Sequence, residues 1–175
     1  MLHQRNVKIV LVDVPKHVNA DFVEKAAHFY AATLLPKLRR RITVTIRWTY
    51  SRKVIGTAEV EFDPTHPIRD FTIIMRGKSR GWLMYQSLAH EFCHVEQWAT
   101  GRLVEVDDKW VLWEGKDYRW DIDSLSYWDL PWELEAMGKE YGLYAKFKAH
   151  YGLKGKDLKA LTNRVRNTDS TPAPI

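Results

Sequence analysis

The sequence predicts a single α+β domain, and three observations support this fold class. Short runs rich in Val, Ile and Thr alternate with longer runs whose apolar residues recur every three or four positions. The chain has 175 residues, which is enough for one sizeable hydrophobic core. Its composition, 45% hydrophobic and 28% charged with eight Trp and eight Tyr, is that of a well-packed globular protein and argues against disorder.

Four runs in the first half have the composition and length of strands: residues 6–14, 41–50, 53–62 and 68–77. The second and third alternate between apolar and polar residues and are separated by a short polar turn, so they are predicted to form a hairpin. Between the first and second runs, residues 19–40 predict a helix, with Asn19 or Asp21 as the N-cap. These elements favour a small, mostly antiparallel sheet.

In the second half, residues 109–120 predict another hairpin with Gly115 at or near its turn. A further helix is expected to begin at Pro131, because proline is favoured in the first helical turn, and to run to about residue 152. The last residues, 166–175, read as a flexible tail. One domain, residues 1–165, is therefore expected.

The most informative stretch is SLAHEFCHVEQWATG, residues 87–101. On a helix, His90 and His94 lie on the same face, so their imidazoles can share one metal ion. Glu91 sits beside the first histidine, where it can act on a metal-bound water without being a ligand. Two imidazoles and a carboxylate base suit hydrolysis by Zn²⁺. Gly101 is a suitable C-cap, and the other face carries the residues expected to pack on a core, namely Leu83, Leu88, Phe92, Val95 and Ala99. Cys93 lies on a different face from the two histidines and is expected to pack rather than to bind the metal.

A zinc site of this kind needs a third protein ligand, and a downstream carboxylate is the best source. The candidates are Glu105, Asp107, Asp108, Glu114, Asp121, Asp123, Glu133 and Glu135. Glu133 and Glu135 are favoured because they begin a second helix that can face the first. They lie about 200° apart on that helix, so only one of them can face the ion.

The pattern His90-Glu91-x-x-His94 resembles the HExxH signature of zincin metallopeptidases. The metzincin pattern is excluded by Gln97 and Thr100, and no suitably placed later histidine matches the SprT-like proteins. The resemblance is closest to gluzincins, whose second helix supplies a glutamate within a Glu-x-x-(Ser/Ala)-Asp pattern. Glu133 with Ala136 matches the start of that pattern, although Met137 stands in place of the Asp.

HEFCHVEQW followed by YWDLPWELEA also looks like the compact zincin-like proteins of phages and bacteria, over about residues 40–150. This resemblance implies a small, mostly antiparallel sheet packed on the HExxH helix, then a hairpin and a glutamate-bearing helix. It implies one Zn²⁺ held by His90, His94 and Glu133, with Glu91 as the general base. Tyr127 is a candidate donor to the oxyanion. Residues that could orient a ligand histidine are Asp121, Asp123 and Gln97.

Zincins also imply that the strand before the active-site helix, here residues 70–77, forms the upper edge of the cleft. The expected activity is cleavage of a protein or peptide substrate. Two alternatives stay open: a zincin-like protein associated with nucleic acid through its basic C-terminal segment, and a catalytically silent zincin fold used for binding or in a virion. The net charge of +5 and pI near 9.3 keep the nucleic-acid alternative open.

No run in the sequence is apolar enough for a membrane span or a secretory signal, and the single Cys93 excludes an internal disulfide. A cytoplasmic protein is therefore expected. The oligomeric state is not predictable from the residues alone.

Overall fold

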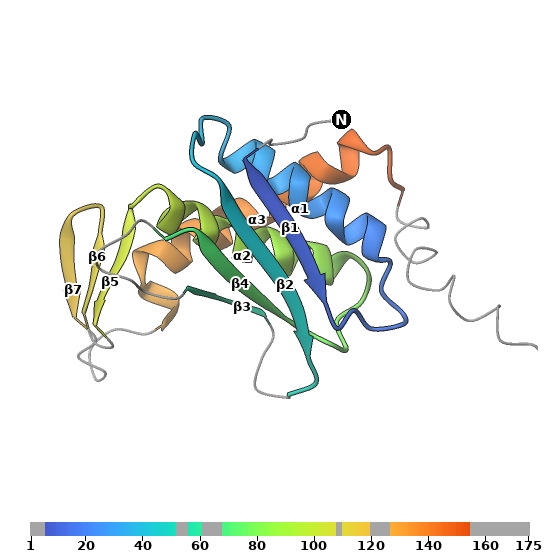
Figure 1. The fold of residues 1–175 in the computed structure, drawn as a ribbon, viewed down its shortest axis with the longest axis horizontal. Coiled ribbons are helices and arrows are strands. Elements are labelled where there is room, and N and C mark those ends of the chain that lie inside the picture. Colours follow the sequence, from blue (N-terminus) through green and yellow to red (C-terminus); the bar gives the residue numbers. More distant parts are fainter. Residues whose placement is uncertain (1–5, 52–55, 61–67, 108–109, 120–126, 155–175) are drawn as a thin grey trace, which may run out of the picture.

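The computed structural model describes residues 6–51, 56–60, 68–107, 110–119 and 127–154. Three α-helices and two sheets make up this part of the chain, so the fold is mixed α+β, as expected (Figure 1). The elements follow in the order β1 (Val7–Val12), α1 (Ala20–Leu34), β2 (Ile42–Thr49), β3 (Gly56–Val60), β4 (Asp70–Arg76), α2 (Gly81–Ala99), β5 (Leu103–Asp107), β6 (Trp110–Trp113), β7 (Lys116–Arg119), the short 3-10 helix η1 (Tyr127–Asp129) and α3 (Pro131–His150).

The larger sheet has the strand order β1-β2-β4-β3, and this corrects two expectations. β1 pairs with β2 and β2 pairs with β4 in parallel, and only β3 is antiparallel to its neighbour, so the sheet is not mostly antiparallel. The predicted hairpin of β2 with β3 is also wrong, because β4 lies between them. Alternation identifies a strand with one buried face but does not identify its partner. β4 has buried residues on both faces, which suits an inner strand, whereas the five-residue β3 suits an edge.

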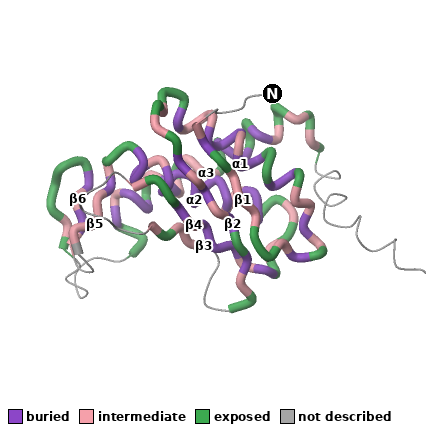
Figure 2. Tube along the Cα trace, in the orientation of Figure 1, coloured by how far each residue is buried: buried purple, intermediate pink, exposed green. Residues whose placement is uncertain are grey.

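The helices cover one face of this sheet, and the core lies between the two layers (Figures 1 and 2). Alternate residues of β2 are buried, as expected for a sheet covered on one side. Asn19 is the N-cap of α1 and accepts a hydrogen bond from the backbone N–H of Phe22 at 3.0 Å. Phe147 of α3 is fully buried among the rings of α1 and α2, including Phe22 and Tyr85.

The smaller sheet is antiparallel, with the order β5-β6-β7, and it extends from one end of the molecule (Figure 1). Its β6–β7 hairpin was predicted, and the turn at Glu114 and Gly115 has φ values of +49° and +77°. Positive φ at both central residues is typical of a type I′ turn, whose twist matches that of the strands. β5 was not predicted.

The HExxH motif lies on α2, and Pro131 begins α3, as expected. Gly101, with φ of +75°, follows the end of α2, and the N–H of Arg102 returns to the carbonyl of Gln97 at 2.9 Å. The predicted core face of α2 is correct except at Leu83, whose exposed fraction is 48%. The predicted tail, residues 166–175, and most of the basic C-terminal segment lie outside the described residues. In the described part of the chain, none of the helices has the length and apolarity that crossing a membrane requires.

Candidate metal centre

The side chains of His90, His94 and Glu133 converge where the first turn of α3 packs against the middle of α2. The Nε2 atoms of the two histidines are 3.1 Å apart. The carboxylate oxygens of Glu133 lie 3.2 Å from His90 Nε2 and 3.4 Å from His94 Nε2. Two buried residues, His94 and Glu133, and the partly buried His90 thus form a group that could hold a metal ion.

These spacings are compatible with one metal ion shared by the three residues. Zinc binds imidazole nitrogens and carboxylate oxygens at about 2.0–2.2 Å, which places two ligand atoms of a tetrahedron about 3.3–3.5 Å apart. The two Nε2 atoms are 3.1 Å apart, and each lies within 3.4 Å of a different oxygen of Glu133. With a single oxygen from Glu133, the three ligand atoms lie within 4.8 Å of one another. In addition, Glu133 Oε2 is buried and makes no hydrogen bond within the described residues. A buried carboxylate oxygen in this position suits a cation ligand.

Both histidines are oriented through their other ring nitrogen. His90 Nδ1 lies 2.9 Å from Glu140 Oε2, and His94 Nδ1 lies 2.8 Å from Gln97 Oε1. Because both partners are acceptors, each Nδ1 carries the hydrogen and donates it. In the neutral form of each ring, the Nε2 lone pair is directed toward the shared point, as a metal ligand requires. A cation bound there would displace any proton held at Nε2.

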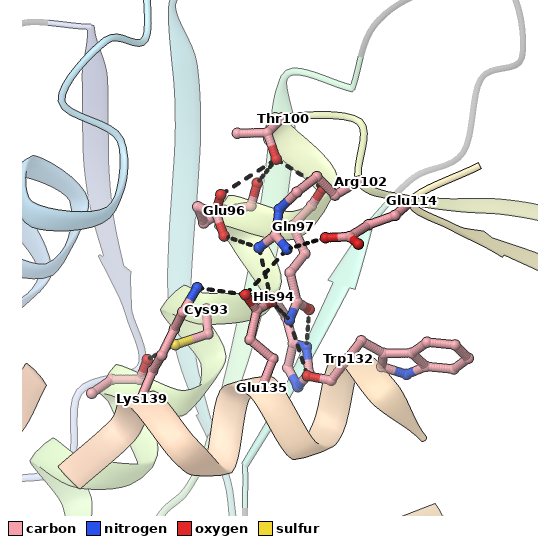
Figure 3. A network of polar contacts seen from close by, with 11 residues as sticks. Cys93, His94, Glu96, Gln97, Thr100, Arg102, Glu114, Trp132, Glu135 and Lys139 are labelled. Carbon is pink, nitrogen blue, oxygen red and sulfur yellow. Dashed lines mark hydrogen bonds and ion pairs between the residues drawn. The ribbon is translucent and has the colours of Figure 1, made fainter. Parts of the chain in front are cut away.

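Figure 3 shows how the orientation of Gln97 is itself determined. Its side-chain N–H₂ donates to the carbonyl of Trp132 at 3.0 Å and to Glu135 Oε2 at 2.9 Å. The amide oxygen must therefore face His94, and Gln97 is fully buried in this position. Gln97, one of three residues expected to orient a histidine of this group, contacts His94 as expected. The other two, Asp121 and Asp123, lie outside the described residues.

Glu135 pairs with basic side chains and does not join the group of His90 and His94, which distinguishes it from Glu133. Its carboxylate accepts hydrogen bonds from Arg102 at 2.8 and 3.1 Å and from Lys139 at 2.7 Å. Burial would raise the pKa of Glu135, but these cations and Gln97 outweigh it and lower the pKa to about 2. Glu135 therefore helps to fix the orientation of the Gln97 amide. Arg102, which donates to Glu135, also donates to Glu96 and Glu114 (Figure 3).

The charge states of His90 and Glu133 depend on each other, because each side chain shifts the pKa of the other. Burial opposes protonation of His90, but the carboxylates of Glu133 and Glu140, at 3.2 and 2.9 Å from its ring nitrogens, raise its pKa to about 10. Burial likewise disfavours the charged form of Glu133, yet the two histidines and the phenol of Tyr127 lower its pKa to about 2. This part of α3 is thus arranged to keep an anionic oxygen beside the two imidazoles.

Glu91 is buried beside the ligand group but does not belong to it. Its carboxylate accepts a hydrogen bond from the backbone N–H of Ala58 in β3. Burial raises the pKa of Glu91 to about 7, against the opposing influence of His94 and His90. A carboxylate with a pKa near neutrality is suited to accept and return a proton.

Tyr127 lies in η1 and lines the same pocket. Its phenol hydrogen-bonds to Glu133, and burial together with that carboxylate raises its pKa. About half of the side chain is exposed. The structure therefore brings Tyr127 to the site, in contact with a ligand residue.

A pocket of about 200 Å³ opens over His90, His94, Glu91 and Glu133. β3 borders this pocket through Thr57 and Ala58. The expectation that residues 70–77 form the edge of the cleft is wrong, because β4 is an inner strand and β3 is the edge. The sequence does not show which strand forms the edge of the sheet. β3 comes before β4 in the chain, but β4 pairs with β2 and leaves β3 at the edge.

Among the other acidic candidates for third ligand, Glu105 lines the pocket without joining the ligand group, and Glu114 pairs with Arg102. Asp108, Asp121 and Asp123 lie outside the described residues, as does the side chain of Asp107. Glu140 was not anticipated. It follows Glu133 by seven positions, which is two helical turns, so helical spacing alone could have placed it on the same face.

Comparison of the chain with protein-family models, with curated proteins and with solved structures finds no match.

Proposed function

We propose that the protein is a zinc-dependent metallopeptidase of the zincin type, with His90, His94 and Glu133 as the metal ligands. The observation that carries this proposal is the convergence of three side chains whose ligand atoms lie within 4.8 Å of one another, with both histidines held by acceptors at Nδ1. This donor set, two imidazoles and one carboxylate, is the one found in catalytic zinc sites that keep a fourth position open.

When bound, zinc would polarise the scissile carbonyl and lower the pKa of water at the open position. Glu91 is the residue in the pocket that is free to accept the proton of the attacking water, since it is not a ligand. It would then return this proton to the leaving nitrogen. Tyr127, which borders the pocket, is the candidate hydrogen-bond donor to the developing oxyanion.

Two variants test this proposal together. The purified protein should contain about one zinc per chain by emission spectrometry and should cleave casein or a mixed peptide substrate. Glu91→Gln should keep the zinc but lose roughly 100-fold or more of the cleavage rate, because a general base typically contributes that much. The control is Glu24→Gln, an exposed carboxylate on α1 remote from the pocket, which should cleave at the wild-type rate. Equal cleavage by wild type and Glu91→Gln would exclude the mechanism.

A protein that binds zinc but cleaves no substrate would instead favour a catalytically silent binding role. The retained carboxylate at position 91 argues against this outcome. A buried glutamate whose pKa is raised costs stability, and a purely structural zinc site has no use for it.

A further inference from the structure

Glu105 is placed unusually for a carboxylate. It lies on β5 two residues after the buried Leu103, so both side chains are on the same face of the strand. It pairs in register with Val111 of β6, which is also buried. All three residues line the pocket that contains the metal group. The residues that the small sheet contributes to the pocket are thus two buried apolar side chains and one half-buried carboxylate.

No residue within the described ranges forms an ion pair or a hydrogen bond with the carboxylate of Glu105. The nearest arginine in sequence, Arg102, is engaged by Glu96, Glu114 and Glu135 instead. Burial alone raises the pKa of Glu105. A carboxylate held in an apolar wall without a counter-charge costs free energy, and such groups concentrate at binding sites.

The surroundings indicate what kind of group would pair with this carboxylate. Trp98 and Trp132 also line the pocket. Aromatic rings attract organic cations, and the methylene stems of Lys and Arg pack well on apolar surfaces such as Leu103 and Val111. A long basic side chain combines the two features, with an apolar stem for the wall and a charged end for Glu105.

We propose that Glu105 determines specificity, by binding an organic cation of the peptide substrate, and that this cation is an Arg or Lys side chain close to the scissile bond. The inference rests on the proposed peptidase function. A free α-ammonium group carries the same charge but has no apolar stem, so it would leave the wall of Leu103 and Val111 uncovered. A free α-ammonium group is therefore a less suitable partner for Glu105 than an Arg or Lys side chain.

Binding tests the inference without requiring cleavage. The zinc-loaded Glu91→Gln protein would be titrated calorimetrically with acetyl-Ala-Ala-Arg-Ala-Ala-amide and with the analogue that carries citrulline, the neutral isostere of arginine. The arginine peptide should bind about 10-fold or more tightly, since a charge-assisted hydrogen bond is lost with citrulline. Adding Glu105→Gln should reduce this preference to near unity, whereas adding Glu24→Gln should leave it unchanged. Zinc content checks that each variant is folded, and Glu105→Asp should restore part of the preference.

Equal affinity for the two peptides in the protein with Glu105 would overturn the inference. A third peptide, unblocked Ala-Ala-Ala-amide, distinguishes the sources: if its binding depends on Glu105 and that of the arginine peptide does not, the cation is a chain terminus and the side-chain assignment is wrong. Cleavage of a peptide library separates the two proposals. Binding that depends on Glu105 without cleavage by the wild type would remove only the peptidase function. Cleavage with no preference for basic residues would remove only the role of Glu105.

Discussion

The Nδ1 atom of His94 lies 2.8 Å from the side-chain oxygen of Gln97, one turn later on the same helix. This contact connects the metal group to a second layer of polar residues, because the amide of Gln97 also donates to Glu135 and to the backbone of α3. The imidazole is thereby held in one tautomer and one orientation.

Replacing Gln97 by Met should therefore weaken zinc binding while preserving the volume of the side chain. The expected loss is about 10- to 100-fold in affinity, as is usual when the partner of a ligand histidine is removed. Competition with a chromophoric chelator measures it. The control is Glu24→Gln on α1, which does not line the pocket and should bind zinc as the wild type does. Wild-type affinity in Gln97→Met would mean that His94 is oriented by other contacts.

The two glutamates of α3 should behave differently although they are only two residues apart. Glu133→Gln should abolish stoichiometric zinc binding, because a neutral amide is a poor replacement for the anionic ligand. Glu135→Gln should retain the zinc and weaken its affinity only through Gln97. Emission spectrometry after dialysis against a weak chelator distinguishes them. If Glu135→Gln lost the metal and Glu133→Gln kept it, the assignment of the third ligand would be reversed.

Arg102 should matter for stability, because it links the beginning of β5 to both helices of the site. It contacts Glu96 at 2.6 Å, Glu135 at 2.8 Å and Glu114 at 3.1 Å. Arg102→Met should lower the free energy of unfolding by about 1–3 kcal/mol, since it removes hydrogen bonds between charged groups. Urea denaturation of the metal-free protein measures the change. Arg47→Met, which removes one exposed ion pair at 3.8 Å, should cost less than about 1 kcal/mol.

The aromatic rings that pack between α1, α2 and α3 should contribute strongly to the stability of the fold. Phe147 is fully buried and contacts rings from α1 and α2, so Phe147→Ala should cost about 3–5 kcal/mol of stability. Tyr141 lies on the same helix, but its exposed fraction is 67%. Tyr141→Ala should change stability by about 0.5 kcal/mol or less. Similar denaturation midpoints for the two variants would contradict this packing.

Much of the local structure was predictable because it depends on neighbours along the chain. The N-cap at Asn19, the turn at Gly115 and the helix start at Pro131 all follow from the preferences of single residues, and the structure contains each of them. The stacking of His90 and His94 follows from helical geometry alone. Two of the three residues of the metal group, His90 and His94, could therefore be predicted from their spacing on one helix.

Other features were decided by which elements pack together, and a periodic pattern carries no information about that. Alternation in β2 and β3 predicted strands but not that β4 would lie between them. The face of α3 that meets α2 determined that Glu133 joins the histidines and that Glu135 binds Arg102. The same packing brought Glu140 to His90 and placed Glu105 in the pocket wall. Spacing along a helix or strand determines which side chains share a face, whereas the partner of that face depends on contacts between residues far apart in the chain, which only the tertiary structure provides.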